Sequence, residues 1–194
     1  MKKRLNKSLV ILLAFLIIFT GQSPVFAQQT LESEANVKSL LVANADTGEV
    51  YYAKDTDTSY GVASMSKMMT YLVIKDELEE GLYKEDDLVK VTDAASKYAQ
   101  PGYSKMDLVT GEIISIKNLL TGLMVVSAND AAAALAIKSS GTEDAFAKKM
   151  NEKAVEIGLE NSIFVNASGL TISGDGEDVV DRYNQMSAND IYKL

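Results

Sequence analysis

The sequence contains no histidine and no cysteine. Without histidine there is no Ser-His-Asp triad, in which an imidazole takes the proton of the serine. Without cysteine there is no thiol nucleophile, no zinc site of the usual Cys/His type and no disulfide framework. Any hydrolytic chemistry must therefore use hydroxyl, carboxylate, amide or lysine side chains, and the fold must be held together by packing alone.

The first 27 residues have the pattern of a secretory signal peptide. Basic residues at positions 2, 3, 4 and 7 precede the apolar stretch Ser8–Thr20, and Val25-Phe26-Ala27 follows with small residues at the cleavage positions. A membrane span needs about 20 apolar residues, so this shorter stretch favours cleavage after Ala27 over retention as an N-terminal anchor. The pattern predicts an exported, extracytoplasmic protein of the cell envelope whose only membrane contact is through the signal peptide.

Residues 28–194 are long enough for one domain with a core of its own. The whole chain carries a net charge of −8, and residues 1–27 carry four positive and no negative charges, which leaves −12 on residues 28–194. An acidic domain of this kind argues against nucleic acid as a partner.

Hydrophobic periodicity predicts a chain that mixes strands and helices. Two β-rich runs, 37–44 and 49–54, flank a Gly-containing turn and are typical of a hairpin. Four helices and the start of a fifth are predicted, together with one short strand: helices over 64–78, 116–126, 131–139, 142–157 and from 187 onward, and a strand over 88–92. Thr142 is the expected N-cap of the fourth helix and Gly158 its stop, while residues 55–61 and 166–169 are expected to be loop and turn.

The acidic loop 174–181 raises the question of a calcium site. Its carboxylates lack the ligand spacing of a helix-loop-helix calcium site. The sequence favours a solvated loop, and no metal ion or organic cofactor is predicted.

The candidate catalytic pair is Ser64 and Lys67, at the start of the first predicted helix. Residues three apart lie on one face of a helix, so the two side chains can touch. A serine becomes a good nucleophile only when a base takes its proton, and a lysine amine can do so if burial lowers its pKa. The alternative is an N-cap serine followed by a surface lysine, since a Ser-x-x-Lys match is expected by chance in a chain of this composition.

A second candidate pair, Ser127 and Asn129, lies 63 and 65 residues after Ser64, at a break between two predicted helices. The Ser127 hydroxyl could pass a proton, and the Asn129 amide could hydrogen-bond the backbone of a substrate. The structural alternative is an N-cap for the helix that follows, and the two roles are compatible. The letters Ser-Ala-Asn-Asp recur at 187–190, and only the copy at 127–130 is predicted to be catalytic.

Ser-x-x-Lys followed by Ser-x-Asn is part of the signature of penicillin-binding proteins and class A β-lactamases. Four ordered blocks, VASMSKMMTYLVI, LLTGLMVVSANDAAAALA, FAKKMNEKAVEIGLENSIFVNASGL and MSANDIYKL, resemble the serine D-alanyl-D-alanine carboxypeptidases, the low-molecular-weight penicillin-binding proteins. The resemblance runs from about Val37 to Leu194. It implies an α+β fold of the β-lactamase/transpeptidase type, with a sheet covered by helices.

The resemblance also implies a role for each candidate residue. Ser64 would be the acylated nucleophile, Lys67 its general base, Ser127 the proton relay and Asn129 the residue that binds the peptide substrate. The implied substrate is a peptidoglycan stem peptide that ends in D-Ala-D-Ala, and β-lactam antibiotics would be inhibitors.

The chain departs from the family pattern because it contains no Lys-Thr-Gly or Lys-Ser-Gly motif. The later strands of the sheet are therefore expected to be missing, so that residues 28–194 would be the N-terminal part of a catalytic domain. Helix faces that the full sheet would cover, with Leu119, Leu120, Leu123 and Met124, are then expected to be partly exposed. Two alternatives to a carboxypeptidase stay open. One is an inactive cell-wall-binding remnant, and the other is a serine β-lactamase, which residues 156–160 disfavour because they do not match Glu-x-x-Leu-Asn.

Overall fold

The computed structural model describes residues 36–173 and 180–194. The predicted signal peptide, residues 1–27, lies outside the described residues, and so does most of the acidic loop, residues 174–179. Lys38–Leu194 form one compact unit of the chain, and all the elements named below belong to it.

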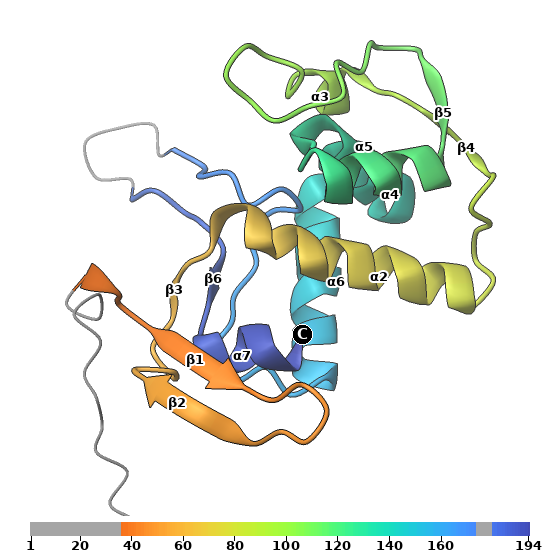
Figure 1. Cartoon of the computed structure of the whole chain (residues 1–194). Coiled ribbons are helices and arrows are strands. Elements are labelled where there is room, and N and C mark those ends of the chain that lie inside the picture. The colour runs from red at the N-terminus through yellow and green to blue at the C-terminus, as the bar shows by residue number, and fades with distance from the viewer. Residues whose placement is uncertain (1–35, 174–179) are drawn as a thin grey trace, which may run out of the picture. The chain divides into compact units, whose positions relative to one another are not determined.

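Short strands and helices alternate along this unit (Figure 1). The strands are β1 (Leu40–Ala43), β2 (Val50–Lys54), β3 (Tyr60–Gly61), β4 (Leu88–Lys90), β5 (Ile113–Ser115) and β6 (Gln185–Met186). The helices are the 3-10 helix η2 (Ala63–Ser66) and the α-helices α2 (Lys67–Glu79), α3 (Asp93–Ser96), α4 (Ile116–Val125), α5 (Asn129–Ser140), α6 (Glu143–Glu156) and α7 (Ala188–Lys193).

The predicted hairpin is confirmed, and β1 pairs with β2 in antiparallel fashion. Asn44 organises its turn, because the side-chain oxygen accepts hydrogen bonds from the N–H groups of Asp46 and Thr47 at 2.9 and 3.1 Å. Gly48 completes the turn with a φ of +73°, a conformation that glycine adopts without strain.

Two further sheets of two strands each were not expected from the sequence. β3 pairs with β6 in antiparallel fashion, although residues 55–61 were predicted to be a loop, because a two-residue strand is too short to show an alternating pattern. β6 also exchanges two hydrogen bonds of 2.9 Å with Ile163 through Gln185. β4, which the sequence predicts, pairs with β5, which it does not.

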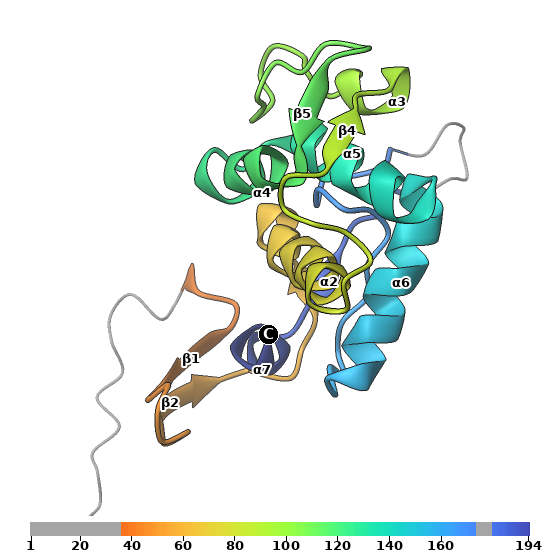
Figure 2. The ribbon, with the colours of Figure 1, turned by 90° about the vertical axis from the view of Figure 1, so that its right-hand side faces the viewer.

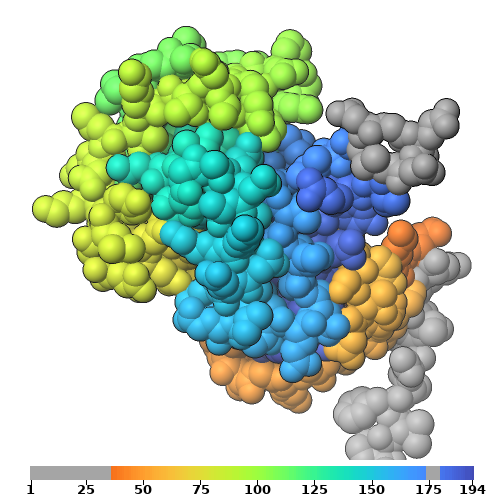
Figure 3. Space-filling model, turned by 180° about the vertical axis from the view of Figure 1, so that it is seen from behind, coloured from red at the N-terminus to blue at the C-terminus, as the bar shows by residue number. Residues whose placement is uncertain are grey.

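The core of the unit is helical, and α2 lies in its middle (Figures 1 and 2). α2 packs against α4, α5 and α6, and α5 contributes six consecutive buried apolar residues, Ala131–Ala136, all of them alanine except Leu135. The small alanine side chains let the neighbouring helices approach closely. Seen from behind, α6 and the segment that follows it cover this side of the core (Figure 3).

Several helix boundaries differ from the sequence prediction. α2 begins at Lys67, and Ser64 lies in the 3-10 helix that precedes it. α5 begins at Asn129, two residues earlier than predicted. α6 follows the prediction, since the Thr142 hydroxyl accepts a hydrogen bond from the Ala145 N–H at 3.1 Å.

The expectation of exposed leucines on α4 is wrong. Leu119, Leu120 and Leu123 are buried, and only Met124 of the four named residues is exposed. The leucines contact the helices around them, so their burial does not depend on a larger sheet.

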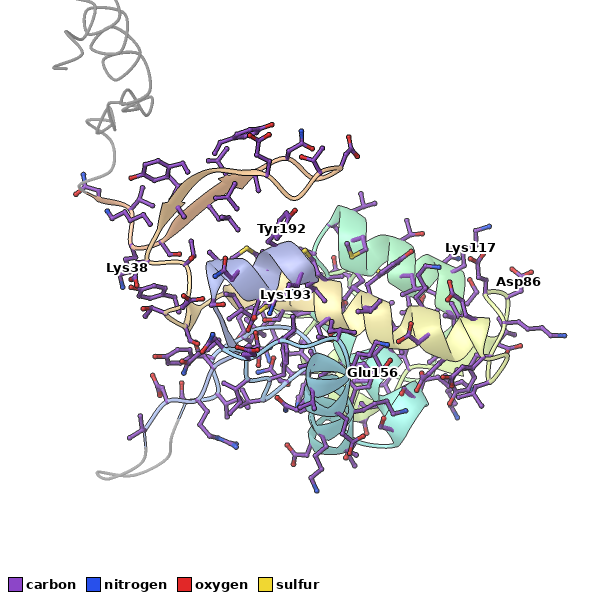
Figure 4. All side chains as sticks on the ribbon, turned by 90° about the horizontal axis from the view of Figure 1, so that it is seen from below. Lys38, Asp86, Lys117, Glu156, Tyr192 and Lys193 are labelled. Atoms are coloured by element: carbon purple, nitrogen blue, oxygen red, sulfur yellow. The ribbon has the colours of Figure 1, made fainter. Side chains whose placement is uncertain are left out.

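The helix predicted to start near residue 187 is confirmed as α7, which lies beside the hairpin (Figure 4). The Tyr192 hydroxyl donates to the carbonyl oxygen of Asn44 at 3.3 Å, and the Lys193 ammonium donates to that of Gly158 at 2.8 Å. Within residues 36–173 and 180–194, no helix combines the length and apolar character that a membrane crossing requires.

Candidate active site

The predicted pair of Ser64 and Lys67 is brought together at the junction of η2 and α2. Ser64 is exposed in the 3-10 helix, whereas Lys67, the first residue of α2, retains only 3% of its exposure. The Lys67 Nζ lies 3.2 Å from the Ser64 Oγ. An accessible hydroxyl therefore touches a buried amine, which is the arrangement that a serine nucleophile with a lysine base requires.

Lys67 has two other partners, both from distant parts of the sequence. Its Nζ lies 2.8 Å from the Asn129 Oδ1 and 2.7 Å from the carbonyl oxygen of Ser168. A neutral amine has two N–H groups and one lone pair. Asn129 and Ser168 can accept the two N–H groups, which leaves the lone pair directed at the Ser64 hydroxyl.

The environment of Lys67 makes that neutral form more accessible than it is for a lysine in water. Burial lowers the pKa of Lys67 from 10.5 to about 8, because an ammonium loses its hydration when it leaves water. Within the described part of the chain, no carboxylate forms an ion pair with Lys67 that would oppose this effect.

Asn129 lies at the N-terminus of α5, and its orientation is fixed by the lysine. The Nζ donates toward Asn129 both as an ammonium and in the neutral arrangement described above, so the amide oxygen faces Nζ. The amide nitrogen has no hydrogen-bond partner among the described residues, and it is not among their fully buried unsatisfied atoms. It is therefore free to donate to a bound molecule.

In the described structure Ser127 forms no hydrogen bond with either member of the pair. Its side chain is half-buried and makes no hydrogen bond to any residue in the described ranges. Its φ of +56° is uncommon for a non-glycine residue, and strain of this kind often accompanies a functional site. Ser127 is also not the N-cap of α5, a place that Ala128 takes without a side-chain hydrogen bond.

One contact of the site was not predicted from the sequence, and it is made by the turn Asn166–Gly169. The turn itself was predicted, but not that the Ser168 carbonyl would bind Lys67. The Asn166 Oδ1 accepts hydrogen bonds from the N–H groups of Ser168 and Gly169 at 3.1 and 2.7 Å. The only sequence signal is the turn-forming composition of Asn-Ala-Ser-Gly, which says nothing about a partner 101 residues away.

This turn also packs against the residue before the nucleophile. Ala63 has a φ of +45°, and its carbonyl accepts a hydrogen bond of 2.6 Å from the Ser66 hydroxyl. A Cβ atom on Gly169 would meet the Ala63 carbonyl oxygen at 1.9 Å. Only glycine fits there, and the turn is consequently in direct contact with the backbone of Ala63, the residue before Ser64.

The second Ser-Ala-Asn-Asp tetrapeptide has a structural role. Ser187 is the N-cap of α7, and its Oγ accepts the Asp190 N–H at 3.1 Å. In both copies the final aspartate is buried and accepts backbone N–H groups of an earlier loop. Asp130 binds those of Met106 and Leu108, and Asp190 binds those of Glu160 and Asn161. The copies differ at the serine, which caps its helix only in the second.

Within residues 36–173 and 180–194, no group of three or more aspartate or glutamate side chains is arranged to hold a metal ion.

Comparison with known proteins identifies related sequences over almost the whole of the described chain. A family model described as D-alanyl-D-alanine carboxypeptidase (Peptidase_S11) matches residues 25–194. The D-alanyl-D-alanine carboxypeptidase DacF of Bacillus subtilis (strain 168) is 38% identical over 174 residues, which are 88% of this chain and 44% of DacF.

Solved structures agree with the family match. The crystal structure of the D-alanyl-D-alanine carboxypeptidase DacD from Francisella tularensis has a TM-score of 0.70 and 32% identity, covering 80% of this chain and 35% of DacD. That of penicillin binding protein 5 from Haemophilus influenzae has a TM-score of 0.69 and 30% identity, covering 79% and 42%. The predicted fold class is thereby confirmed. The chain spans less than half the length of each of these three relatives.

Proposed function

Because this chain belongs to the D-alanyl-D-alanine carboxypeptidase family, we propose that it removes the terminal D-alanine from peptidoglycan stem peptides through an acyl-enzyme on Ser64. The observation that carries the proposal is the contact of a buried amine, the Lys67 Nζ, with an exposed serine hydroxyl at 3.2 Å. The contacts to Asn129 and Ser168 support it, because they occupy the two N–H groups of the neutral amine.

In the acylation step, the Ser64 Oγ attacks the carbonyl carbon of the penultimate D-alanine while its proton passes to the Lys67 Nζ. The C–N bond of the tetrahedral intermediate then breaks, an ester forms on Ser64, and the leaving amine takes up a proton and departs as D-alanine. The Ser64 N–H, which binds no acceptor in the described residues, is available to stabilise the oxyanion.

Ser127 and Asn129 assist this step in the proposal. The Ser127 hydroxyl has no hydrogen-bond partner in the described structure, and in the proposal it relays the proton from Lys67 to the leaving nitrogen. The free Asn129 amide nitrogen donates to the peptide backbone of the substrate. In the second step a water molecule gives a proton to the Lys67 Nζ and attacks the ester carbonyl carbon. The bond from that carbon to the Ser64 Oγ then breaks, Lys67 returns the proton to Ser64, and the shortened peptide leaves with a new carboxyl group.

The place of action and the inhibitors follow from the substrate. Peptidoglycan lies outside the cytoplasmic membrane, so the protein would be exported with residues 1–27 as its signal peptide. The Haemophilus influenzae relative is a penicillin binding protein. Penicillins resemble the D-Ala-D-Ala backbone, and we expect them to form a stable ester with Ser64 here.

A labelled penicillin tests the proposal directly. The purified protein is incubated with it, digested and analysed by mass spectrometry, and release of D-alanine from a D-Ala-D-Ala peptide is measured in parallel. We expect label on the peptide that contains Ser64, no label in Ser64→Ala, and measurable D-alanine release.

Other outcomes would support the alternatives. Label on another residue would contradict the assignment of Ser64. An unlabelled, folded wild-type protein would favour a cell-wall-binding protein without activity. Rapid turnover of penicillin without D-alanine release would favour a β-lactamase.

A further inference from the structure

Asn184 is a fully buried polar residue directly before β6, and it bonds to both parts of the chain that hold the catalytic pair. Its side-chain oxygen accepts the N–H groups of Val165 and Asn166 at 2.7 and 3.2 Å. Its side-chain nitrogen donates to the Asn166 carbonyl at 2.8 Å. Its own carbonyl accepts the Val62 N–H at 3.1 Å. Both polar atoms of the side chain are thus used for backbone contacts.

The side-chain contacts lead to Lys67. Asn184 fixes both backbone groups of Asn166, and the Asn166 side chain in turn accepts the Ser168 N–H at 3.1 Å. The Ser168 carbonyl is the acceptor closest to the Lys67 Nζ, at 2.7 Å. The position of that carbonyl is therefore set through Asn166 by Asn184.

The backbone contact leads to Ser64. Val62 is two residues before Ser64. The hydrogen bond from its N–H to the carbonyl oxygen of Asn184 continues the pairing of β3 with β6. Ala63, between them, packs its carbonyl against Gly169 of the turn. Asn184 thus contacts two backbone segments, the one directly before Ser64 and the one that binds the Lys67 Nζ.

We propose that Asn184 is a positioning residue that sets the distance and direction between Ser64 and Lys67. The inference rests on the proposed function, since it names the residue that aligns its nucleophile with its base. Asn184 is fully buried and forms no hydrogen bond to Ser64 or Lys67, so it acts through Val62 and through Asn166–Ser168. An asparagine suits this place because one planar amide both accepts and donates.

A matched control is available in Asn151. Its side chain donates to the Phe164 carbonyl at 2.7 Å and accepts the Phe164 N–H at 2.9 Å. It anchors the same segment to α6, but it bonds to neither the turn 166–169 nor the residues before Ser64. Asn151→Ala therefore removes a comparable backbone anchor without disturbing the proposed alignment.

The experiment compares wild type, Asn184→Ala and Asn151→Ala at temperatures well below each melting transition. The first readout is the rate of acylation by a labelled penicillin. The second is the NMR signal of the Lys67 Cε methylene in lysine-labelled protein, assigned with Lys67→Arg. Asn184→Asp, which keeps the side-chain oxygen and the size of the residue, serves as a second variant if Asn184→Ala does not fold.

We expect acylation to slow by about 10- to 100-fold in Asn184→Ala, because misplacing reacting groups by about 1 Å has an effect of this size. The chemical shift of the Lys67 Cε methylene should change in Asn184→Ala and stay the same in Asn151→Ala. The acylation rate of Asn151→Ala should remain within about twofold of wild type. Equal effects of the two variants on both readouts would show that Asn184 only stabilises the fold and would overturn the proposal. If the wild type is not acylated at all, the proposed function fails, whereas the Lys67 signal still decides the role of Asn184.

Discussion

The side chain of Lys67 is almost completely removed from water, and burial lowers its pKa from 10.5 to about 8. A general base must be unprotonated to accept the Ser64 proton. Below the pKa the amine is mostly charged, so the reactive fraction rises as the pH rises and levels off above it. The pH dependence of acylation therefore measures the pKa of Lys67.

We predict that acylation by a labelled penicillin speeds up about tenfold for each pH unit below about 8 and is constant above it. Rates measured from about pH 6 to pH 10 would show this. In Lys67→Ala the rate should no longer rise with pH. At pH values above about 8 its acylation should be about 10² to 10⁴ times slower than that of wild type, because general-base catalysis typically contributes a factor of this size. A midpoint near 10.5, the ordinary value for lysine, would show that the amine is hydrated and not the buried base inferred here.

Gly169 cannot be replaced without strain, because both its backbone conformation and its surroundings require glycine. Its φ is +81°, and a Cβ atom would lie 1.9 Å from the Ala63 oxygen. We predict that Gly169→Ala destabilises the fold by roughly 2 to 4 kcal/mol, because overpacking adds to the strain of a left-handed alanine.

Gly158→Ala is the matched control. Gly158 has a φ of +74° but no atom near the position of a Cβ, so only the conformational strain of about 1 kcal/mol applies. Calorimetry should give a lower melting temperature for Gly169→Ala than for Gly158→Ala. Equal melting temperatures would mean that the turn can move away from Ala63 without loss.

At the scale of elements, the two Ser-Ala-Asn-Asp tetrapeptides start helices in different ways. Ser187 caps α7 with its hydroxyl, whereas Ser127 takes a left-handed conformation and leaves its hydroxyl free before α5. We predict that Ser187→Ala costs about 1 kcal/mol of stability through the lost cap and leaves the acylation rate of the folded protein unchanged.

Ser127→Ala should do the opposite, since it removes no hydrogen bond of the described structure. Its melting temperature should stay close to that of wild type, while its acylation rate falls. Calorimetry and penicillin labelling of both variants would test this. A larger loss of rate in Ser187→Ala at equal stability would reverse the assignment of the two copies.

The elements that could be predicted from the sequence are those with local signals. The hairpin has a turn between two β-rich runs, and α6 has its own cap in Thr142 and its stop at Gly158. The pair β3–β6 could not be predicted, because two-residue strands show no periodicity and their pairing joins residues far apart in the sequence. The exposure expected for the α4 leucines failed for a related reason, since burial depends on which helices pack together.

The same division applies to the candidate site. Ser64 and Lys67 are three residues apart, so helical geometry alone brings them together. The contact of Lys67 with Asn129 spans 62 residues and agrees with the motif, although the motif gave Asn129 only a substrate-binding role. Ser168 and Asn184 could not be found from the sequence, because a backbone carbonyl and a backbone-binding asparagine leave no pattern in the residue types.

At the scale of the whole molecule, the exposed apolar residues are not evenly distributed. Met124, Val125 and Val126 are consecutive and exposed, and they lie directly before Ser127. Exposed apolar residues that lie close together favour association between molecules. Val155 on α6 is equally exposed, at 79% against 75% for Val125, but neither of its sequence neighbours is an exposed large apolar residue.

We predict that Val125→Lys lowers self-association more than Val155→Lys does. Both variants add one positive charge to an acidic protein, so their effect on net charge is the same and only the position differs. Val125 is the last residue of α4, where a cation interacts favourably with the helix dipole. The melting temperature of Val125→Lys should therefore not fall below that of wild type. Light scattering over a range of protein concentrations, with calorimetry alongside, would measure both effects. If the two variants reduced scattering equally, the run 124–126 would have no special part in association, and added charge alone would account for the change.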